Sequence, residues 1–225
     1  MAAYGGPDGA GQMRHFRNDL GLNVFRLPVA WQYLAGGQLG VDFNADNFAK
    51  YDALVQACLG TGAKCIIDLH NYARWNGNIV GQSGGAVINE HLTNAWWQLA
   101  TKYKNEQNII FGIMNESASA LSGVKDTDGT TSKLVFDVHQ YLDPGRAGKT
   151  TDCDWDGLDG GLKVLADWLR ANGRKAYNTD VFVGWVGWSA GSFDSSYELT
   201  LTPTWNGNSW VDTSLMTDCV AGKFK

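Results

Sequence analysis

The 225-residue sequence has little that would direct it to a membrane or to nucleic acid. No apolar run approaches the ~20 residues that a membrane-spanning helix needs. Basic residues are not in excess, because 18 Lys and Arg stand against 23 Asp and Glu, for a net charge of −5. Residues 1–6 also lack the charged and apolar regions of a secretory signal. We therefore expect no membrane partner, no nucleic-acid partner and no signal peptide in this chain.

Metal-binding residues are equally scarce. The chain has four Cys and four His, with no Cys-x-x-Cys and no clustered histidines, so we expect no metal and no cofactor. Cys58 and Cys65 flank the end of a helical pattern and the start of a strand pattern, close enough for a local disulfide. The pairing of Cys153 and Cys219 stays open, since spacing alone does not decide it.

The sequence is rich in tryptophan and glycine, with 10 Trp and 28 Gly. Its length suits one domain, residues 1–225, with no separate binding module. Ten indoles exceed the need of one core, and the flat face of an exposed Trp can stack on a sugar ring. The alternative, that they are large core aromatics, remains open for each Trp.

Helical and strand patterns alternate along the chain. Helices are predicted at Met13–Leu20, Asn47–Leu59, a segment capped by Asn89, Leu162–Leu169 ending near Gly173, and Ser214–Val220. Strands are predicted at Leu22–Val29, broken by Pro28, and at Lys64–His70, Asn108–Met114, Lys133–Val138 and Val181–Val186. Continuous apolar strands separated by helices predict an α/β fold with a parallel sheet.

Polar groups follow most of the predicted strands. They are Arg26, His70 with Asn71 and Tyr72, Asn115 and Glu116, His139 and Tyr141, and Trp188. In a parallel β/α barrel these strand ends meet on one face, where sites are built. Glu116 is the best candidate for a general acid, because burial at a strand end favours a protonated carboxyl. The alternative is that Asn115 and Glu116 cap the next helix.

Five segments in order resemble the fungal endoglucanases of glycoside hydrolase family 5. They are Leu22–Leu34, Asp68–Gly77, Phe111–Glu116, Phe136–Asp143 and Gly184–Asp194. The resemblance covers nearly the whole chain. It implies a (β/α)8 TIM barrel and retaining hydrolysis of β-1,4-glucan by two glutamates, one the acid/base and the other the nucleophile.

The resemblance also implies residue roles. Glu116 corresponds to the acid/base, Asn115 to the group that binds the sugar 2-hydroxyl, and Arg26 to the arginine that steadies the nucleophile. His139 and Tyr141 correspond to the pair flanking the carboxylates, His70 to a sugar-binding residue, and Trp188 to the platform under the sugar. Trp75 and Trp31 are predicted as further walls of the sugar subsites.

The sequence departs from the family where the nucleophile should stand. Its only glutamates are Glu90, Glu106, Glu116 and Glu198, and none matches the nucleophile. By the resemblance, the helix Leu162–Arg174 runs on through Ala176. Family segments are missing at the N-terminus, after Glu116 and after Ala176, so strands one, five and seven of the barrel are not recognisable. We therefore expect an incomplete barrel, carrying internal deletions, with little or no activity, since hydrolysis needs two carboxyls.

Two functions remain as hypotheses. The first is a family 5 cellulase-type hydrolase with Glu116 as its acid/base. The second is a non-catalytic remnant of the barrel that binds β-glucan through its tryptophans. The resemblance implies a monomeric, extracellular protein whose partner is a polysaccharide, and a Cys58–Cys65 bond would suit an oxidising compartment.

Overall fold

The computed structural model describes residues 8–112, 135–138, 163–171, 175–178, 187, 190–191, 196–197 and 199–221. Its helices are α1 (Gly9–Asn18), α2 (Trp31–Leu34), α3 (Ala45–Leu59), α4 (Asn89–Tyr103), α5 (Lys163–Ala171) and η3 (Leu215–Ala221). Its strands are β1 (Val24–Val29), β2 (Lys64–Leu69), β3 (Arg74–Trp75), β4 (Asn78–Ile79), β5 (Ile109–Gly112), β6 (Val135–Val138), β7 (Lys175–Asn178), β8 (Thr204–Trp205) and β9 (Trp210–Val211).

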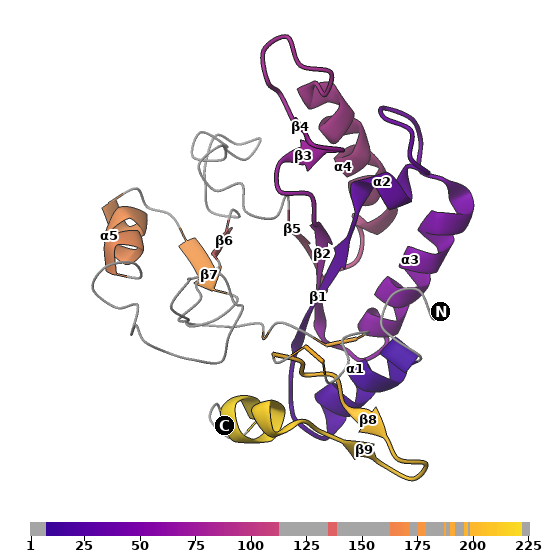
Figure 1. The fold of residues 1–225 in the computed structure, drawn as a ribbon, viewed down its shortest axis with the longest axis vertical. Helices are drawn as coiled ribbons and strands as arrows, with labels where there is room; N and C mark the ends of the chain where they lie inside the picture. Colours follow the sequence, from indigo (N-terminus) through magenta and orange to yellow (C-terminus); the bar gives the residue numbers. More distant parts are fainter. Residues whose placement is uncertain are drawn as a thin grey trace. The chain divides into compact units, whose positions relative to one another are not determined.

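Strands β1, β2 and β5 form a parallel sheet in that order. Helix α3 connects β1 to β2 and lies alongside both strands, as Figure 1 shows. Helix α4 makes the next crossover, from β2 to β5. Because a parallel pair needs such a crossover, the repeated strand and helix order gives two consecutive β/α units. This part of the chain confirms the α/β prediction.

The two faces of this sheet differ in chemistry because successive strand residues point to opposite faces. One face carries Leu27, Val29, Cys65, Ile67 and Leu69, which belong to the hydrophobic core together with Tyr51 and Val55 of α3. The alternate residues include Arg26 in β1 and Asp68 in β2. A buried ionisable pair therefore occupies the sheet face turned away from the helices.

Pro28 does not break β1, which runs unbroken to Val29. Val29 accepts the amide hydrogen of His70, and Asn23 accepts that of Lys64. In a parallel pair, every second residue of a strand directs its backbone groups to the same neighbouring strand. Asn23 and Val29 face β2, so Pro28, directly before Val29, faces away from β2. The missing N–H of Pro28 therefore costs no bond in this ladder.

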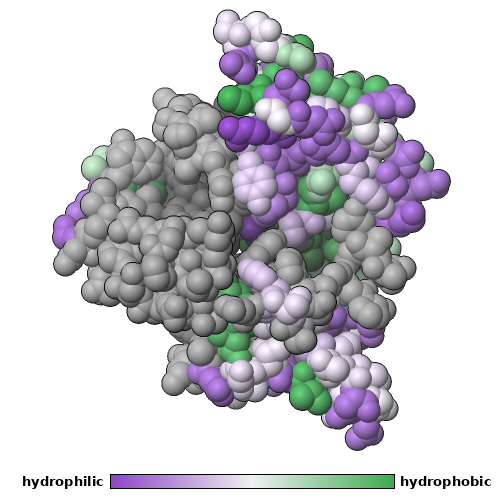
Figure 2. Space-filling model, viewed as in Figure 1, coloured by the Kyte–Doolittle hydropathy of each residue, from purple (hydrophilic) through white to green (hydrophobic). Residues whose placement is uncertain are grey.

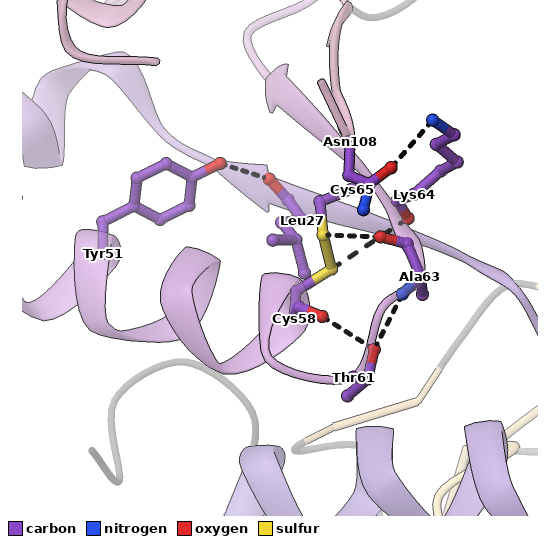
Figure 3. The surroundings of a disulfide bond; sticks show 8 residues. All are labelled: Leu27, Tyr51, Cys58, Thr61, Ala63, Lys64, Cys65 and Asn108. Atoms are coloured by element: carbon purple, nitrogen blue, oxygen red, sulfur yellow. Dashed lines mark hydrogen bonds between the residues drawn. A yellow bond between two sulfur atoms is a disulfide. The ribbon is translucent and has the colours of Figure 1, made fainter. Parts of the chain in front are cut away.

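A disulfide joins the end of α3 to the start of β2. Cys58 and Cys65 are bonded with their Cα atoms 6.2 Å apart, which confirms the predicted local bridge. In Figure 3, Thr61 in the intervening turn donates its hydroxyl to the Cys58 carbonyl at 2.7 Å, and Tyr51 donates to the Leu27 carbonyl at 2.7 Å. Helix α3 is thus held to the sheet at both β1 and β2.

The boundaries of some helices and strands differ from those predicted from the sequence. Asn89 is the first helical residue of α4 rather than its cap, which is Ile88. Residues Lys175 and Ala176 belong to strand β7, which pairs in parallel with β6, and not to the helix before it. The predicted strand at Val181–Val186 lies outside the described residues. The last helix, η3, lies within one residue of the predicted Ser214–Val220.

The C-terminal segment is tied to α1 through one histidine. His15 in α1 lies 2.6 Å from Asp19 through Nδ1 and 2.9 Å from Asp212 through Nε2. Its ring also stacks on Trp210 of β9, which follows β8 in a short hairpin. Burial of the imidazole opposes its charge, but the hydrogen bonds to Asp212 and Asp19 prevail and raise the pKa of His15 above the ordinary 6.5.

The free energy of unfolding should therefore depend on pH through His15. A raised folded-state pKa means that the contribution is complete below pH 6.5 and is lost as the pH rises through the folded-state value. We expect the difference in unfolding free energy between the wild type and His15→Gln to shrink as the pH is raised through this range. Urea denaturation at a series of pH values measures it, and a difference that stays constant would contradict the assignment.

The large exposed hydrophobic side chains of the described residues come from several elements, including β4, α4, β5 and β8. Trp97 on α4 is the most exposed of the large ones in the described part, at 65%. On the face drawn in Figure 2, hydrophobic residues of the described part occur in small groups between hydrophilic ones. Scattered residues of this kind are normal on protein surfaces. Among the described helices, none is long and apolar enough to cross a membrane.

Candidate functional site

The candidate site lies where β1 and β2 end, and its centre is one buried carboxylate. Asp68 Oδ2 accepts from Arg26 Nη2 at 3.0 Å, and His70 Nδ1 lies 2.7 Å from the same oxygen. The side chains of Arg26 and Asp68 are 3% and 2% exposed. The register explains the ion pair, because Arg26 is paired with Ile66 and so lies diagonally across from Asp68 on the same sheet face.

The network extends to the surface through the loop after β2. His70 Nε2 lies 3.0 Å from the Tyr72 hydroxyl, and the two rings meet edge to face at 5.1 Å. Tyr72 is 46% exposed. Hydrogen bonds therefore lead from a buried guanidinium to an exposed phenol.

The backbone of this loop is strained. Tyr72, Ala73 and Asn76 have φ values of 52°, 55° and 46°. The left-handed region costs a residue other than glycine of order 1 kcal/mol or more, and such residues cluster at functional sites. For Asn76 the reason is local, because Asn76 and Gly77 form the tight turn between β3 and β4. Tyr72 and Ala73 are likewise the central residues of a turn, closed by the Arg74 amide, which donates to the Asn71 carbonyl at 2.8 Å directly after the buried network.

Asn71 fixes this loop to the loop that follows β1. Its Oδ1 accepts from the backbone amide of Trp31 at 2.8 Å, and its Nδ2 donates to Gln32 Oε1 at 2.7 Å. Asn71 is 7% exposed. The carboxyl ends of β1 and β2 are thereby held together as one rigid edge.

Trp31 and Trp75 do not have the position that the sequence suggested. They are 2% and 5% exposed, they belong to the hydrophobic core, and their rings meet at 4.7 Å in a T-shaped pair. A sugar stacks only on an open ring face. We correct the prediction of subsite walls: both are core residues beneath the loops.

The structure brings together two of the predicted site residues, Arg26 and His70. The others, Asn115, Glu116, His139, Tyr141 and Trp188, lie outside the described residues, so their roles stay predictions. Within the described part of the chain, no group of three or more His, Cys, Asp or Glu side chains could hold a metal ion.

Sequence reasoning missed Asp68 as a member of this site, and it placed Asn71 and Tyr72 at the strand end without giving them a role. A signal was present, because Asp68 is the one charged residue inside the buried run Cys65–Leu69 and lies two positions before His70. Residues two apart on a strand share a face. An acid and an imidazole at that spacing predict the contact now observed.

Chemically, the edge offers a fixed cation, a carboxylate and an imidazole leading to an exposed aromatic hydroxyl. Such an arrangement orients hydroxyl groups and steadies a nearby anion. It holds no second buried carboxyl beside Asp68 among the described residues, and Asp68 itself is occupied by Arg26 and His70. Among the described residues, this edge therefore offers hydrogen-bonding groups without a pair of carboxyls.

These features agree with what the chain resembles. The model of the family described as Cellulase (glycosyl hydrolase family 5) matches residues 1–127. Since this is more than half of the chain, the protein belongs to glycoside hydrolase family 5.

Similar individual proteins support the same family. Endoglucanase EG-II of Hypocrea jecorina is 42% identical, with 96% of this chain and 69% of the relative covered. Endoglucanase 1 of Saitozyma flava is 38% identical, with 87% and 78% covered. The crystal structure of Cel5A (EG2) from Hypocrea jecorina is 40% identical and superposes with a TM-score of 0.86, over 96% of this chain and 87% of that one.

The fold is accordingly one derived from the TIM barrel, and the described strands β1, β2 and β5 are a part of it. The match to EG-II extends over 289 residues, which is longer than this 225-residue chain. The relative therefore has residues within the matched span that have no counterpart here. That agrees with the expected internal deletions.

Proposed function

We propose that this protein acts on β-1,4-glucan as a family 5 hydrolase, with Glu116 as the acid/base and a rate limited by the lack of a second catalytic glutamate. The observation that supports it most is the buried Arg26, Asp68 and His70 network at the strand ends of a chain related to endoglucanases. A rigid edge of this kind orients a polymer at the point of cleavage.

The proposed roles divide between two groups of residues. Arg26 and His70 supply the fixed cation and the imidazole, while Asn115, Glu116, His139, Tyr141 and Trp188 supply the acid/base and its surroundings. Retaining hydrolysis needs two carboxyls about 5 to 5.5 Å apart, and an inverting mechanism needs about 6.5 to 9.5 Å. Without the second glutamate, Glu116 would still protonate the leaving oxygen, but the glutamate that acts as the family's nucleophile would be missing.

We also propose that the protein works outside the cell, as a single domain and a monomer. Its polymer substrate is extracellular in plant material, and the Cys58–Cys65 disulfide suits an oxidising compartment.

Hydrolysis of carboxymethyl-cellulose tests the catalytic half of the proposal. We expect a low release of reducing ends from the purified wild type and none from Glu116→Gln, because the amide cannot donate a proton to the leaving oxygen. Equal rates for the two proteins would contradict the role of Glu116. A high rate that the variant loses would show that another carboxyl replaces the missing glutamate.

A further inference from the structure

The Asp68 carboxylate determines which nitrogen of His70 carries a hydrogen. An ionised carboxylate has no hydrogen to donate. His70 Nδ1 lies 2.7 Å from Asp68 Oδ2, so Nδ1 must be the donor. Arg26 Nη2, 3.0 Å from the same oxygen, holds the carboxylate in place.

The hydrogen on Nδ1 then fixes the direction of the next bond. A neutral imidazole with Nδ1–H has only a lone pair on Nε2. The Tyr72 hydroxyl, 3.0 Å from Nε2, must therefore donate its hydrogen to His70. With its only hydrogen committed, the phenol oxygen can act toward a ligand only as an acceptor.

We propose that Asp68 is a positioning residue that selects the Nδ1–H tautomer of His70 and thereby makes the exposed Tyr72 an acceptor for a sugar hydroxyl. The ligand, a β-1,4-glucan, rests on the proposed function. Tyr72 is 46% exposed, whereas Trp31 and Trp75 are buried, so of these three aromatic residues Tyr72 is the one that a polymer can reach. Tyr72 lies in the turn after β2, and its ring meets that of His70 edge to face.

Two other histidines provide internal references for the tautomer. The backbone amide of Ile88 donates to His91 Nδ1 at 3.3 Å, so His91 carries its hydrogen on Nε2. His15 lies between the carboxylates of Asp19 and Asp212, which calls for hydrogens on both nitrogens. The three imidazoles therefore differ in their pattern of hydrogens within one chain.

Nitrogen NMR of the full labelled chain tests the positioning role without any ligand. We expect the Nδ1–H form for neutral His70 and the Nε2–H form for neutral His91. In Asp68→Asn the side chain can offer either an oxygen or an NH₂ group to Nδ1, so the Nε2–H form of His70 should gain population. A wild-type His70 in the Nε2–H form would overturn the proposal.

Affinity electrophoresis in a hydroxyethyl-cellulose gel tests the ligand. Tyr72→Phe and Asp68→Asn should each weaken retardation about fivefold, the scale of one lost hydrogen bond. The double variant should lose no more than Tyr72→Phe, because Asp68 acts through the Tyr72 hydroxyl. Trp97→Ala, which removes a more exposed aromatic from α4, should bind like the wild type.

The outcomes distinguish a failure of the proposal about Asp68 and Tyr72 from a failure of the proposed function. Additive losses, or retardation of Tyr72→Phe equal to that of the wild type, would overturn the proposal while leaving the proposed function standing. A wild type that is not retarded would overturn the proposed function and the ligand assigned to Tyr72. The NMR measurement then still decides the role of Asp68, and it needs only the wild type if Asp68→Asn fails to fold.

Discussion

Replacing Asp68 with alanine should lower the free energy of unfolding by about 3 to 5 kcal/mol, the cost of removing one partner from a buried ion pair. The change leaves the Arg26 guanidinium, 3% exposed, without the carboxylate that now lies 3.0 Å away. His70 loses the same acceptor. The sheet edge that carries the candidate site should loosen first.

Urea denaturation followed by tryptophan fluorescence measures this effect. Asp42→Ala is the matched control, because it removes an exposed carboxylate and surface substitutions of this kind change stability by less than about 0.5 kcal/mol. An Asp68→Ala protein as stable as the control would show that the network contributes nothing to the fold.

Replacing Trp31 with alanine should cost about 3 to 5 kcal/mol of unfolding free energy, as truncating large aromatic residues in a core does. Trp31 is 2% exposed and its ring meets Trp75 edge to face. The cavity would open in the core beneath the loops that follow β1 and β2. The same denaturation measurement applies.

Trp97→Ala distinguishes a core role from a surface role. Trp97 is 65% exposed, so its removal should leave the unfolding midpoint almost unchanged. If Trp31 were instead a sugar platform, Trp31→Ala would keep the stability of the wild type and lose only retardation in a β-glucan gel. That result would restore the prediction made from the sequence.

The secondary structure around the site was largely predictable, because the hydrophobic periodicity of α3 and α4 and the apolar runs of β1, β2 and β5 are strong signals. The error at Pro28 had a physical cause. A proline disturbs a strand only where its missing N–H would have served the ladder, and that depends on register, which one sequence does not show.

The tryptophans show a second limit of prediction from the sequence. Composition identifies a surplus of indoles but not the depth of any one of them, and Trp31 lies in the core at 2% exposure whereas Trp97 is exposed. Arg26 and His70 were identified through family resemblance, while Asp68, which joins them, was passed over. Its role follows from a diagonal contact between two strands, and only the paired register reveals it.

The two ends of β2 are secured by different chemistry. At its start Cys65 is bonded to Cys58, and near its end Asp68 holds Arg26 and His70 by charge. Both attachments are buried, since the two cysteines are 0% exposed and the Arg26 and Asp68 side chains 3% and 2%. Neither a mild reductant nor added salt should therefore reach them while the sheet is folded, because salt screens a buried ion pair far less than an exposed one.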